Sequence, residues 1–437
     1  MTTALRPPPV PHGFRGRDVP PDEVMARCVQ CGFCLPTCPT YQLTGNEASS
    51  PRGRIHLISA VASGRLELDS PVFQEQMYQC LNCRACEAVC PSGVAYGRLV
   101  EPARAQIERH LPRPAWERLL RAVVFDHLFG DMRLFRLFSV GTLFYQRSGL
   151  RRLAHATGLL KLLRLEQQEQ LLPEIPTEFV VPIGQRWLPP DGQVRHRVGL
   201  FAGCIMSTAF ADTDRATARV LTRNGCEVIA VAGQGCCGAL AVHAGEPDTG
   251  RACAKRNIVA FEQQGLEAVI VNAAGCGAAL KEYPHLFHGD PEWEERARRF
   301  SASVRDAAEY LDQIGITPPG PLPRKVTYQE PCHLAHAQRI TEAPRRLLRA
   351  IPELRLVEME ESALCCGSAG IYNVTNPGMS QQLAERKLRN ALDTGADTIV
   401  SANPGCIMQL TGGLRQRQSP VRVQHLMDLL DEAYGGA

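Results

Sequence analysis

Near its start the chain reads Cys28-Val-Gln-Cys-Gly-Phe-Cys-Leu-Pro-Thr-Cys-Pro39, and the same spacing recurs as Cys80-Leu-Asn-Cys-Arg-Ala-Cys-Glu-Ala-Val-Cys-Pro91. The 437 residues include 18 cysteines. Disulfide frameworks are typical of exported chains, but residues 1–10 contain no apolar segment of the kind found in signal peptides. The cysteines are therefore expected to serve metal or redox chemistry.

A Cys-x2-Cys-x2-Cys-x3-Cys-Pro run is the ligand set of [4Fe–4S] clusters in bacterial ferredoxins, and its fourth cysteine ligates the other cluster. Two runs therefore predict two complete sites. The first takes Cys28, Cys31, Cys34 and Cys90. The second takes Cys38, Cys80, Cys83 and Cys86.

This exchange has a physical reason. Three thiolates from one tight turn reach three iron corners, whereas the fourth corner needs a chain segment that returns from elsewhere. The proline that follows each run ends the turn and brings no N–H group that would need a partner. A zinc site, which closes with four ligands, would leave the third and fourth cysteine of each run unexplained.

Four regions follow from composition and pattern. The Pro-rich residues 1–20 are expected to be poorly ordered. Residues 21–110 are predicted to form a mainly α-helical ferredoxin domain with two [4Fe–4S] clusters, in which residues 52–61 read as a helix with an apolar stripe. Residues 111–192 are predicted to form an amphipathic helical linker. The remaining chain is a repeat.

The linker mixes aromatic and aliphatic residues with arginines between residues 116 and 172. Its apolar runs are much shorter than the ~18 residues of a membrane-spanning helix. Such helices suit a membrane surface, a partner protein or the rest of the same chain, and their pattern does not separate these alternatives. The formal net charge of +3 gives no reason to expect a nucleic-acid partner.

The repeat consists of two cysteine-bearing copies, residues 193–320 and 321–437. Corresponding cysteines are 128 to 130 positions apart. The first copy contains Cys204, Cys236, Cys237 and Cys276. The second contains Cys332, Cys365, Cys366 and Cys406.

Short β-type runs precede these cysteines, and helical patterns such as residues 213–223 and 381–392 separate the runs. Alternating β and α segments predict a parallel sheet in each copy. The fold class is therefore multidomain, a helical ferredoxin domain followed by two α/β domains. In such sheets ligands sit at the carboxyl ends of the strands, where the cysteines of each copy would converge.

Two interpretations of the repeat cysteines remain open. They form a further iron–sulfur centre or a thiol redox site, or they pack as small apolar residues. Cys226 and Cys253 have no counterpart in the other copy and are interpreted as structural. His333 and His336 could ligate metal, although a polar rim is the more ordinary explanation.

One glycine-rich stretch, Gly233-Gln-Gly-Cys-Cys-Gly238, has the spacing of a dinucleotide fingerprint. The second copy reads Ser362-Ala-Leu-Cys-Cys-Gly367 there and loses two of the three glycines. Cysteines also occupy the place that a pyrophosphate would take. We therefore expect neither a flavin nor a nicotinamide site on this chain.

With these motifs in place, the chain resembles the iron–sulfur subunits of flavin-linked hydroxy-acid and glycerol-3-phosphate dehydrogenases, above all those of bacterial glycolate oxidase. The resemblance covers nearly the whole chain. It rests on Cys28–Tyr41, Pro51–Ile55, Cys90–Gly93, Ala239, Gly275–Gly277 and Leu364–Gly370.

The resemblance implies that a separate flavoprotein subunit oxidises glycolate to glyoxylate and that this subunit passes the electrons toward a membrane quinone. It implies a cytoplasmic location at the inner face of the inner membrane. The rivals are an equivalent subunit for lactate or glycerol 3-phosphate, and a thiol enzyme like heterodisulfide reductase. Related repeats in that enzyme carry a fifth cysteine where this chain has Ala273 and Asn403, which weakens the second rival.

Overall fold

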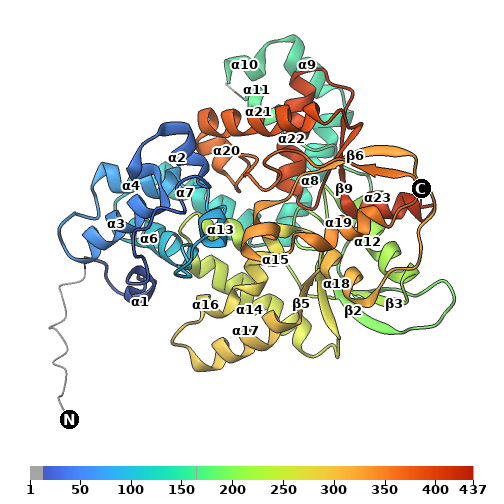
Figure 1. Ribbon diagram of the computed structural model, residues 1–437, viewed down its shortest axis with the longest axis horizontal. Coiled ribbons are helices and arrows are strands. Elements are labelled where there is room, and N and C mark those ends of the chain that lie inside the picture. The colour runs from blue at the N-terminus through green and yellow to red at the C-terminus, as the bar shows by residue number, and fades with distance from the viewer. Residues whose placement is uncertain (1–12, 164, 437) are drawn as a thin grey trace.

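The computed structural model describes residues 13–163 and 165–436. The chain forms a helical N-terminal unit, a set of linker helices and two α/β units that lie against each other (Figure 1). This arrangement confirms the predicted multidomain fold class, with helices first and parallel sheets after them.

The N-terminal unit is built from short helices around the two cysteine runs. They are α1 (Asp22–Met25), α2 (Pro39–Thr44), η1 (Glu47–Ser49), α3 (Pro51–Ala62), α4 (Pro71–Gln79), α5 (Ala85–Ala88) and α6 (Gly97–His110). Three of them begin with proline, where its missing N–H group costs nothing. Ser50 caps α3 by accepting a hydrogen bond from the Gly53 N–H at 2.9 Å. Helix α3 contains the helix predicted over residues 52–61.

The expectation of a poorly ordered start is wrong for residues 13–20, while residues 1–12 lie outside the described residues. Phe14 is buried, and its ring centroid lies 6.2 Å from that of Phe73. The Gln106 side chain hydrogen bonds to three backbone carbonyls of this segment. A single buried aromatic side chain and a buried amide therefore fix a segment whose composition suggested disorder.

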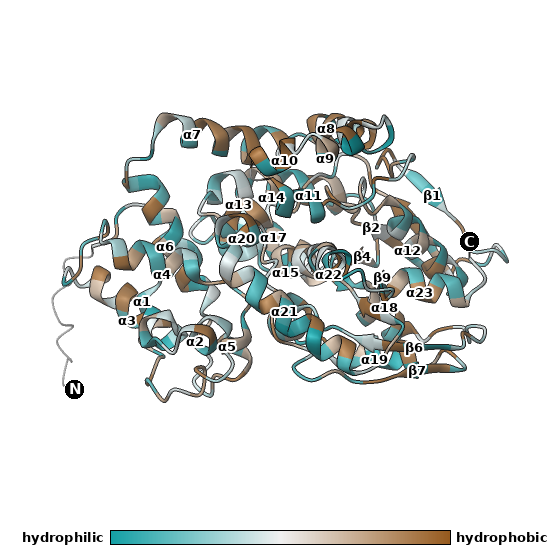
Figure 2. Cartoon of the chain, turned by 90° about the horizontal axis from the view of Figure 1, so that it is seen from above, coloured by the Kyte–Doolittle hydropathy of each residue, from teal (hydrophilic) through white to brown (hydrophobic). Residues whose placement is uncertain are grey.

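The linker is helical, as predicted. Its helices are α7 (Ala115–Arg121), the π-helical η2 (Ala122–Leu128), α8 (Met132–Arg147), α9 (Leu150–Ala156), α10 (Leu159–Leu162) and α11 (Glu166–Gln170). They lie along one side of the molecule (Figure 2). Phe125, Met132 and Phe135 are buried against the first α/β unit. Within the described residues no helix is long and apolar enough to cross a membrane.

The two sheets share one topology. The first contains β1 (Gln185–Trp187), β2 (His196–Leu200), β3 (Cys226–Ala230), β4 (Ala268–Val271) and β5 (Val304–Asp306) in the order β1-β3-β2-β4-β5. The second contains β6 (Arg324–Tyr328), β7 (Leu354–Leu356), β8 (Thr398–Ser401) and β9 (Arg422–His425) in the order β7-β6-β8-β9. All pairings are parallel except that of β1 with β3.

Three strands were not expected from the sequence. β5 and β9 extend each sheet by one short parallel strand. β1 lies within residues 111–192, which were predicted to form a helical linker, and it pairs Gln185 with Ala230 at the edge of the first sheet. A three-residue strand is too short to show a periodic pattern, and its edge position comes from tertiary pairing.

Helices cover both sheets. In the first unit they are α12 (Ala211–Arg223), α13 (Ala239–His243), α14 (Pro247–Glu262), α15 (Ala274–Lys281), α16 (Tyr283–Leu286), α17 (Pro291–Ser303) and α18 (Ala307–Ile314). In the second they are η3 (His333–Ala337), α19 (Glu342–Arg349), α20 (Tyr372–Thr375), α21 (Pro377–Asp393), α22 (Pro404–Gln416) and α23 (Leu426–Ala433). The helices predicted over 213–223 and 381–392 lie within α12 and α21.

The two α/β units share one apolar core, which includes Val198 of the first sheet and Val400 of the second. A buried histidine links the copies. The Nε2–H group of His425 donates to the Asn272 carbonyl at 2.7 Å, and its Nδ1 accepts the Met427 N–H at 3.1 Å. Burial lowers the pKa of His425 to about 4, so the ring is neutral at pH 7.

This histidine predicts a pH-dependent contribution to stability. Its folded-state pKa is depressed, so the contribution is fully present above pH 6.5 and is lost as the pH falls toward 4, by up to about 3 kcal/mol. His425→Gln, which takes up no proton, is expected to be about 1 kcal/mol less stable than the parent at pH 7.5 through the lost hydrogen bond. Urea unfolding between pH 7.5 and 4.5 should show this difference shrinking or reversing. A difference that stays constant across this range would contradict the assignment.

Candidate iron–sulfur sites

The first cavity in the N-terminal unit is lined by five cysteines. Three come from the first run, Cys28, Cys31 and Cys34, and two come from the second, Cys86 and Cys90. Pro51 and Ile55 of α3 form another wall. The Val94 N–H points at the Cys90 sulfur, 3.4 Å away. The lining includes the four thiols that the sequence predicted for the first cluster, and Cys86 lines the second cavity as well.

A second cavity is lined by the complementary set, Cys38, Cys80, Cys83 and Cys86. The Asn82 N–H donates to the Cys80 sulfur at 3.3 Å, and the hydroxyl of Thr40 lies 3.3 Å from the Cys38 sulfur. Backbone N–H groups aimed at sulfur are what a thiolate-bound cluster needs to tune its potential. The structure thus brings each fourth cysteine to the cavity of the other run, and the donor sets fit two cubane clusters.

The two runs adopt the same loop conformation. Gln30 and Gly32 of the first run have φ of 56° and 84°, and Asn82 and Arg84 at the matching positions have φ of 50° and 64°. Glycine tolerates this left-handed region, whereas arginine does not favour it. Ion pairs of Arg84 with two glutamates, at 2.5 and 2.7 Å, hold the strained residue in place.

Sequence reasoning missed the buried cation beside the second cavity. Arg54 is only 1% exposed and donates to the Gln76 carbonyl at 2.7 Å and the Thr40 hydroxyl at 3.0 Å. Its burial disfavours the charge, but the charges of Cys80, Tyr96 and Cys38 raise its pKa. Arg54 lies within residues 51–55, one of the stretches on which the family resemblance rests. That resemblance was the only sequence feature that could have drawn attention to Arg54.

Burial shifts the pKa of the thiols in the two cavities. It raises the pKa of Cys34 to about 11 and that of Cys83 and Cys86 well above the usual range. These thiols are therefore neutral when no metal is bound, and loading iron has to displace their protons.

The first-copy cysteines converge at the carboxyl ends of β2, β3 and β4, as predicted. The Cys237 and Cys276 sulfurs are 3.3 Å apart. Cys204 hydrogen bonds to Cys236, and this bond together with burial raises the pKa of Cys204. Two features were not expected. Cys253, interpreted as structural, packs beside Cys204 and Cys236, and Met132 and Phe135 of the linker cover the group.

The second-copy cysteines also converge, and they lie against the N-terminal unit. Cys366 and Cys406 have their sulfurs 3.3 Å apart, and the Asn403 side chain donates to Cys406 at 3.5 Å. Cys332 and Cys365 pack in one apolar cluster with Cys83 of the second cavity. The second ferredoxin-type site and the second-copy cysteines are therefore immediate neighbours.

The copies differ at one buried position. Helices α14 and α21 both begin with proline, and ten residues later they carry Asn257 and Lys387 respectively. Lys387 is completely buried and donates to the Ser362 carbonyl at 3.0 Å. Burial lowers its pKa to about 8, although the neighbouring Cys366, Cys365 and Cys406 favour its charged form. In the first copy, neutral Asn257 donates to the Cys236 carbonyl at 2.9 Å.

The thiol pKa values also differ between the copies. In the second copy, hydrogen bonds from Cys365 hold the pKa of Cys332 and of Cys366 well below the usual range, whereas hydrogen bonds within the group and burial raise the pKa of Cys365 and Cys406. In the first copy the pKa of Cys236 and Cys237 is raised instead. A buried cation beside two thiols that favour the thiolate form, Cys332 and Cys366, is a setting that suits metal ligands.

The remaining sequence candidates have structural partners. His336 bonds to the Ala363 carbonyl at 3.0 Å through Nε2, and the His333 Nδ1 atom lies 3.8 Å from the Cys332 sulfur. In the glycine-rich stretch the Gly235 N–H donates to Asn257, and the Gly238 N–H donates to the Cys236 sulfur. These N–H groups are engaged within the protein.

Comparison with known proteins agrees with this division of the chain. A 4Fe-4S dicluster domain matches residues 24–94, and a cysteine-rich domain matches twice, at residues 198–281 and 326–411. The linker region of the glycolate oxidase iron-sulfur subunit matches residues 116–172.

Three relatives illustrate the similarity. A probable glycolate oxidase iron-sulfur subunit of Bacillus subtilis is 42% identical over 419 residues, which is 94% of each chain. The glycolate oxidase iron-sulfur subunit of Escherichia coli is 35% identical over 94% of this chain and 95% of its own. Lactate utilization protein A of Oceanobacillus iheyensis is 32% identical over 54% of this chain and 96% of its own.

The buried Arg54 guanidinium predicts an effect on one site only. Because a positive charge favours the reduced, more negative cluster, Arg54→Leu is expected to lower the reduction potential of the second site. For a charge within ~10 Å at an effective dielectric constant near 20, the shift is on the order of 50–100 mV. Potentiometric titration followed by EPR measures both centres. Arg52→Leu, which removes a half-buried arginine lining the first cavity, is the control and should leave the second centre unchanged. An equal shift of both centres in Arg54→Leu would contradict the assignment.

Proposed function

We propose that this chain, which belongs to the family of glycolate oxidase iron–sulfur subunits, carries electrons from a flavoprotein that oxidises glycolate to glyoxylate toward a membrane quinone. The observation that carries the proposal is the pair of cavities, each of which is lined by its predicted set of four thiols drawn from both runs. Cysteine-bound [4Fe–4S] clusters there would supply one-electron relays. The hydride chemistry belongs to the partner, and this chain is the electron-transfer subunit of the oxidoreductase.

The exposure of the two sites suggests the direction of electron flow. At the first site Cys31 is exposed, and Val29 and Phe33 beside it are 68% and 65% exposed. At the second site Cys38, Cys83 and Cys86 are buried. Apolar side chains around an accessible redox site suit the transient docking of a protein partner. We therefore place the flavoprotein at the first site and the electron exit beyond the second.

A third centre is proposed in the second copy. Two of its four cysteines, Cys332 and Cys365, pack with Cys83 of the second site. Lys387 supplies the buried positive charge that four thiolates and a cluster require. The first copy has a neutral asparagine at the matching position, and we propose no cluster there. The chain would then hold two [4Fe–4S] clusters and one further iron–sulfur cluster.

An equivalent role in lactate oxidation is the second candidate. It is favoured by the similarity to lactate utilization protein A over 54% of this chain. The substrate is decided by the partner flavoprotein. Assaying the assembled complex with glycolate, lactate and glycerol 3-phosphate separates the candidates, because only one of them should reduce this subunit rapidly.

Removing one ligand tests the electron-transfer role. In the assembled complex, Cys83→Ala is expected to abolish glycolate-dependent quinone reduction while the flavoprotein still reduces a soluble dye. Cys226→Ala, a buried cysteine in the strand core, is the control and should keep both activities. Full quinone reduction by Cys83→Ala would rule out the proposed role.

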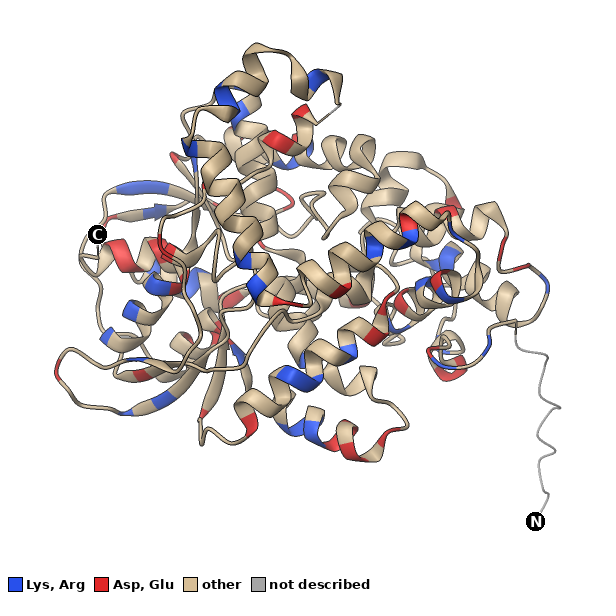
Figure 3. Ribbon diagram, turned by 180° about the vertical axis from the view of Figure 1, so that it is seen from behind, with Lys and Arg blue, Asp and Glu red and all other residues tan. Residues whose placement is uncertain are grey.

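The linker face is proposed to contact an anionic membrane surface. Of the 25 exposed large apolar side chains in the described residues, 15 lie between residues 116 and 165. Residues 115–163 also contain eight Lys or Arg and three Asp or Glu, more positive than the whole chain at +3. Elsewhere both charge signs are interspersed (Figure 3). Apolar side chains among arginines favour the interface of acidic lipids, at the inner face of the inner membrane.

Vesicle flotation tests this contact. The subunit is expected to float with vesicles that contain phosphatidylglycerol and to dissociate at high salt. Leu137 and Phe138 are 67% and 55% exposed, and changing both to Glu should weaken binding at least tenfold, since each buried apolar side chain contributes about 1.5–3 kcal/mol. Leu188→Glu, 58% exposed and beyond the last linker helix α11, is the matched control. Equal binding by all variants would exclude this surface.

A further inference from the structure

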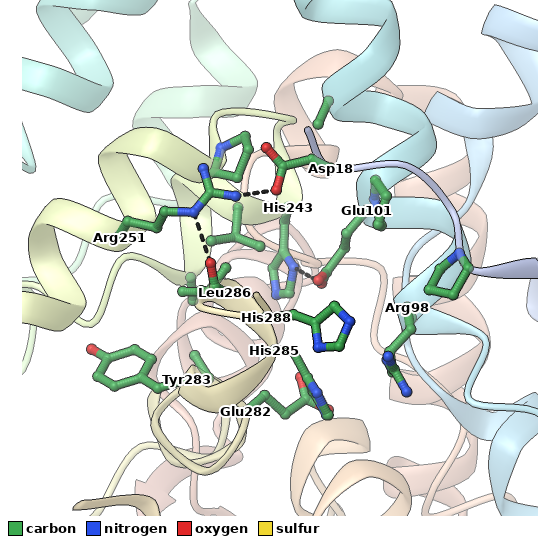
Figure 4. A pocket seen from close by; sticks show the side chains of 18 of the residues that line it. Asp18, Arg98, Glu101, His243, Arg251, Glu282, Tyr283, His285, Leu286 and His288 are labelled. Carbon is green, nitrogen blue, oxygen red and sulfur yellow. Dashed lines mark hydrogen bonds and ion pairs between the residues drawn. The ribbon is translucent and has the colours of Figure 1, made fainter. Parts of the chain in front are cut away.

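A cavity of about 320 Å³ lies between the N-terminal unit and the first α/β unit. Helix α6 and the segment before α1 form one wall, and α13, α14 and α16 form the other (Figure 4). Its volume falls in the range of small-molecule sites, and like them it lies where two units meet. The proposed cluster ligands do not require it, so it is free for another use.

The cavity touches two of the cysteine sites. Arg84 lines it, and this residue stands between Cys83 and Cys86 of the second site. Cys237 of the first copy lines it too. A molecule held there is therefore next to the centre from which electrons are proposed to leave.

The interior holds an oriented imidazole. The His243 Nδ1 atom lies 2.8 Å from the Glu101 carboxylate, which also accepts a hydrogen bond from Asn82 at 2.7 Å. Burial would raise the pKa of Glu101, but the hydrogen bond to His243 and the charges of His243 and Arg84 hold it well below its usual range. Because Nδ1 faces this carboxylate, the ring's Nε2 is the atom that can give a proton to a ligand.

The charges around the cavity are mostly compensated. Arg84 pairs with Glu282 at 2.7 Å, and Arg251 pairs with Asp18. Burial lowers the pKa of His285, so this ring faces the space in its neutral form (Figure 4). Apolar walls complete the site and include Val19, Pro21, Pro102, Ala105, Val242 and Leu286. Compensated charge and apolar walls favour an uncharged, flat ligand with polar atoms at its edge over a free carboxylate.

We propose that this cavity binds the ring of a quinone and is the place where the quinone is reduced. This inference rests on the proposed function and assigns a binding site to the quinone, its electron acceptor. The ring takes two electrons from the reduced centres of the chain and two protons, so that both C=O groups become C–OH and no other bond breaks. One proton comes from His243 Nε2. His288, 80% exposed at the cavity lining, connects the site with solvent for the second proton and for reprotonation.

Binding is tested first, without turnover. Isothermal titration calorimetry of the oxidised, cluster-loaded subunit uses ubiquinone-1, a short-chain quinone. Val242→Phe, which fills the cavity beside His243, is expected to weaken binding at least tenfold. His196→Gln is the control, because His196 pairs with Glu267 at 3.0 Å on the first sheet, away from the cavity. Unchanged binding by Val242→Phe would overturn the proposal, as would a site that takes glyoxylate but no quinone.

Proton delivery is tested by reoxidation of the prereduced subunit in a stopped-flow instrument. His243→Gln is expected to slow reoxidation by ubiquinone-1 on the order of 10²-fold, the usual contribution of a general acid. Reoxidation by ferricyanide, which takes electrons without protons, should stay unchanged. Equal slowing with both acceptors would mean that His243 only supports the fold and would overturn its role.

The same experiment separates failure of this site from failure of the proposed function. If the parent subunit reduces ferricyanide but no quinone, then the proposed acceptor is wrong and the site falls with it. If the parent and both cavity variants reduce quinone at the same rate, then the acceptor stands and only the cavity assignment is overturned.

Discussion

The arrangement of the N-terminal unit depends on one constraint, that neither cysteine run can complete a four-thiol cavity alone. Cys90 must reach the first cavity and Cys38 the second. The helices between the runs hold both loops at the required separation, and Arg54 of α3 fills the buried polar space beside the second cavity. The same exchange keeps the two proposed clusters adjacent, which electron transfer between them requires.

The N-terminal unit contacts the repeat beside the second cavity. Cys83 packs with Cys332 and Cys365, so the duplicated domain does not stand apart from the ferredoxin-type sites. The two copies of the repeat contain corresponding groups of four cysteines, but the buried residue beside each group differs in charge. The second copy has Lys387 beside its thiols, whereas the first copy has the neutral Asn257. Only Lys387 compensates the negative charge of a bound centre.

The features that could be predicted from the sequence are those with a local sequence pattern. The cysteine spacings, the α3 helix and the parallel sheets all follow from motif or periodicity, and the structure contains them. Features made by tertiary contact were missed. Phe14 anchors residues 13–20, β1 exists only through its pairing with β3, and Cys253 joins the first-copy thiols because α14 turns it toward them. The buried Lys387 looks like an ordinary surface position on an amphipathic helix.

The most direct test is the iron and acid-labile sulfide content of the anaerobically purified subunit, compared with that of Cys366→Ala. Two shared cubane sites and a third centre beside Lys387 predict about twelve irons in the parent and about eight in the variant. About eight irons in both would contradict the third centre. Fewer than about eight in the parent would contradict the shared ligation itself.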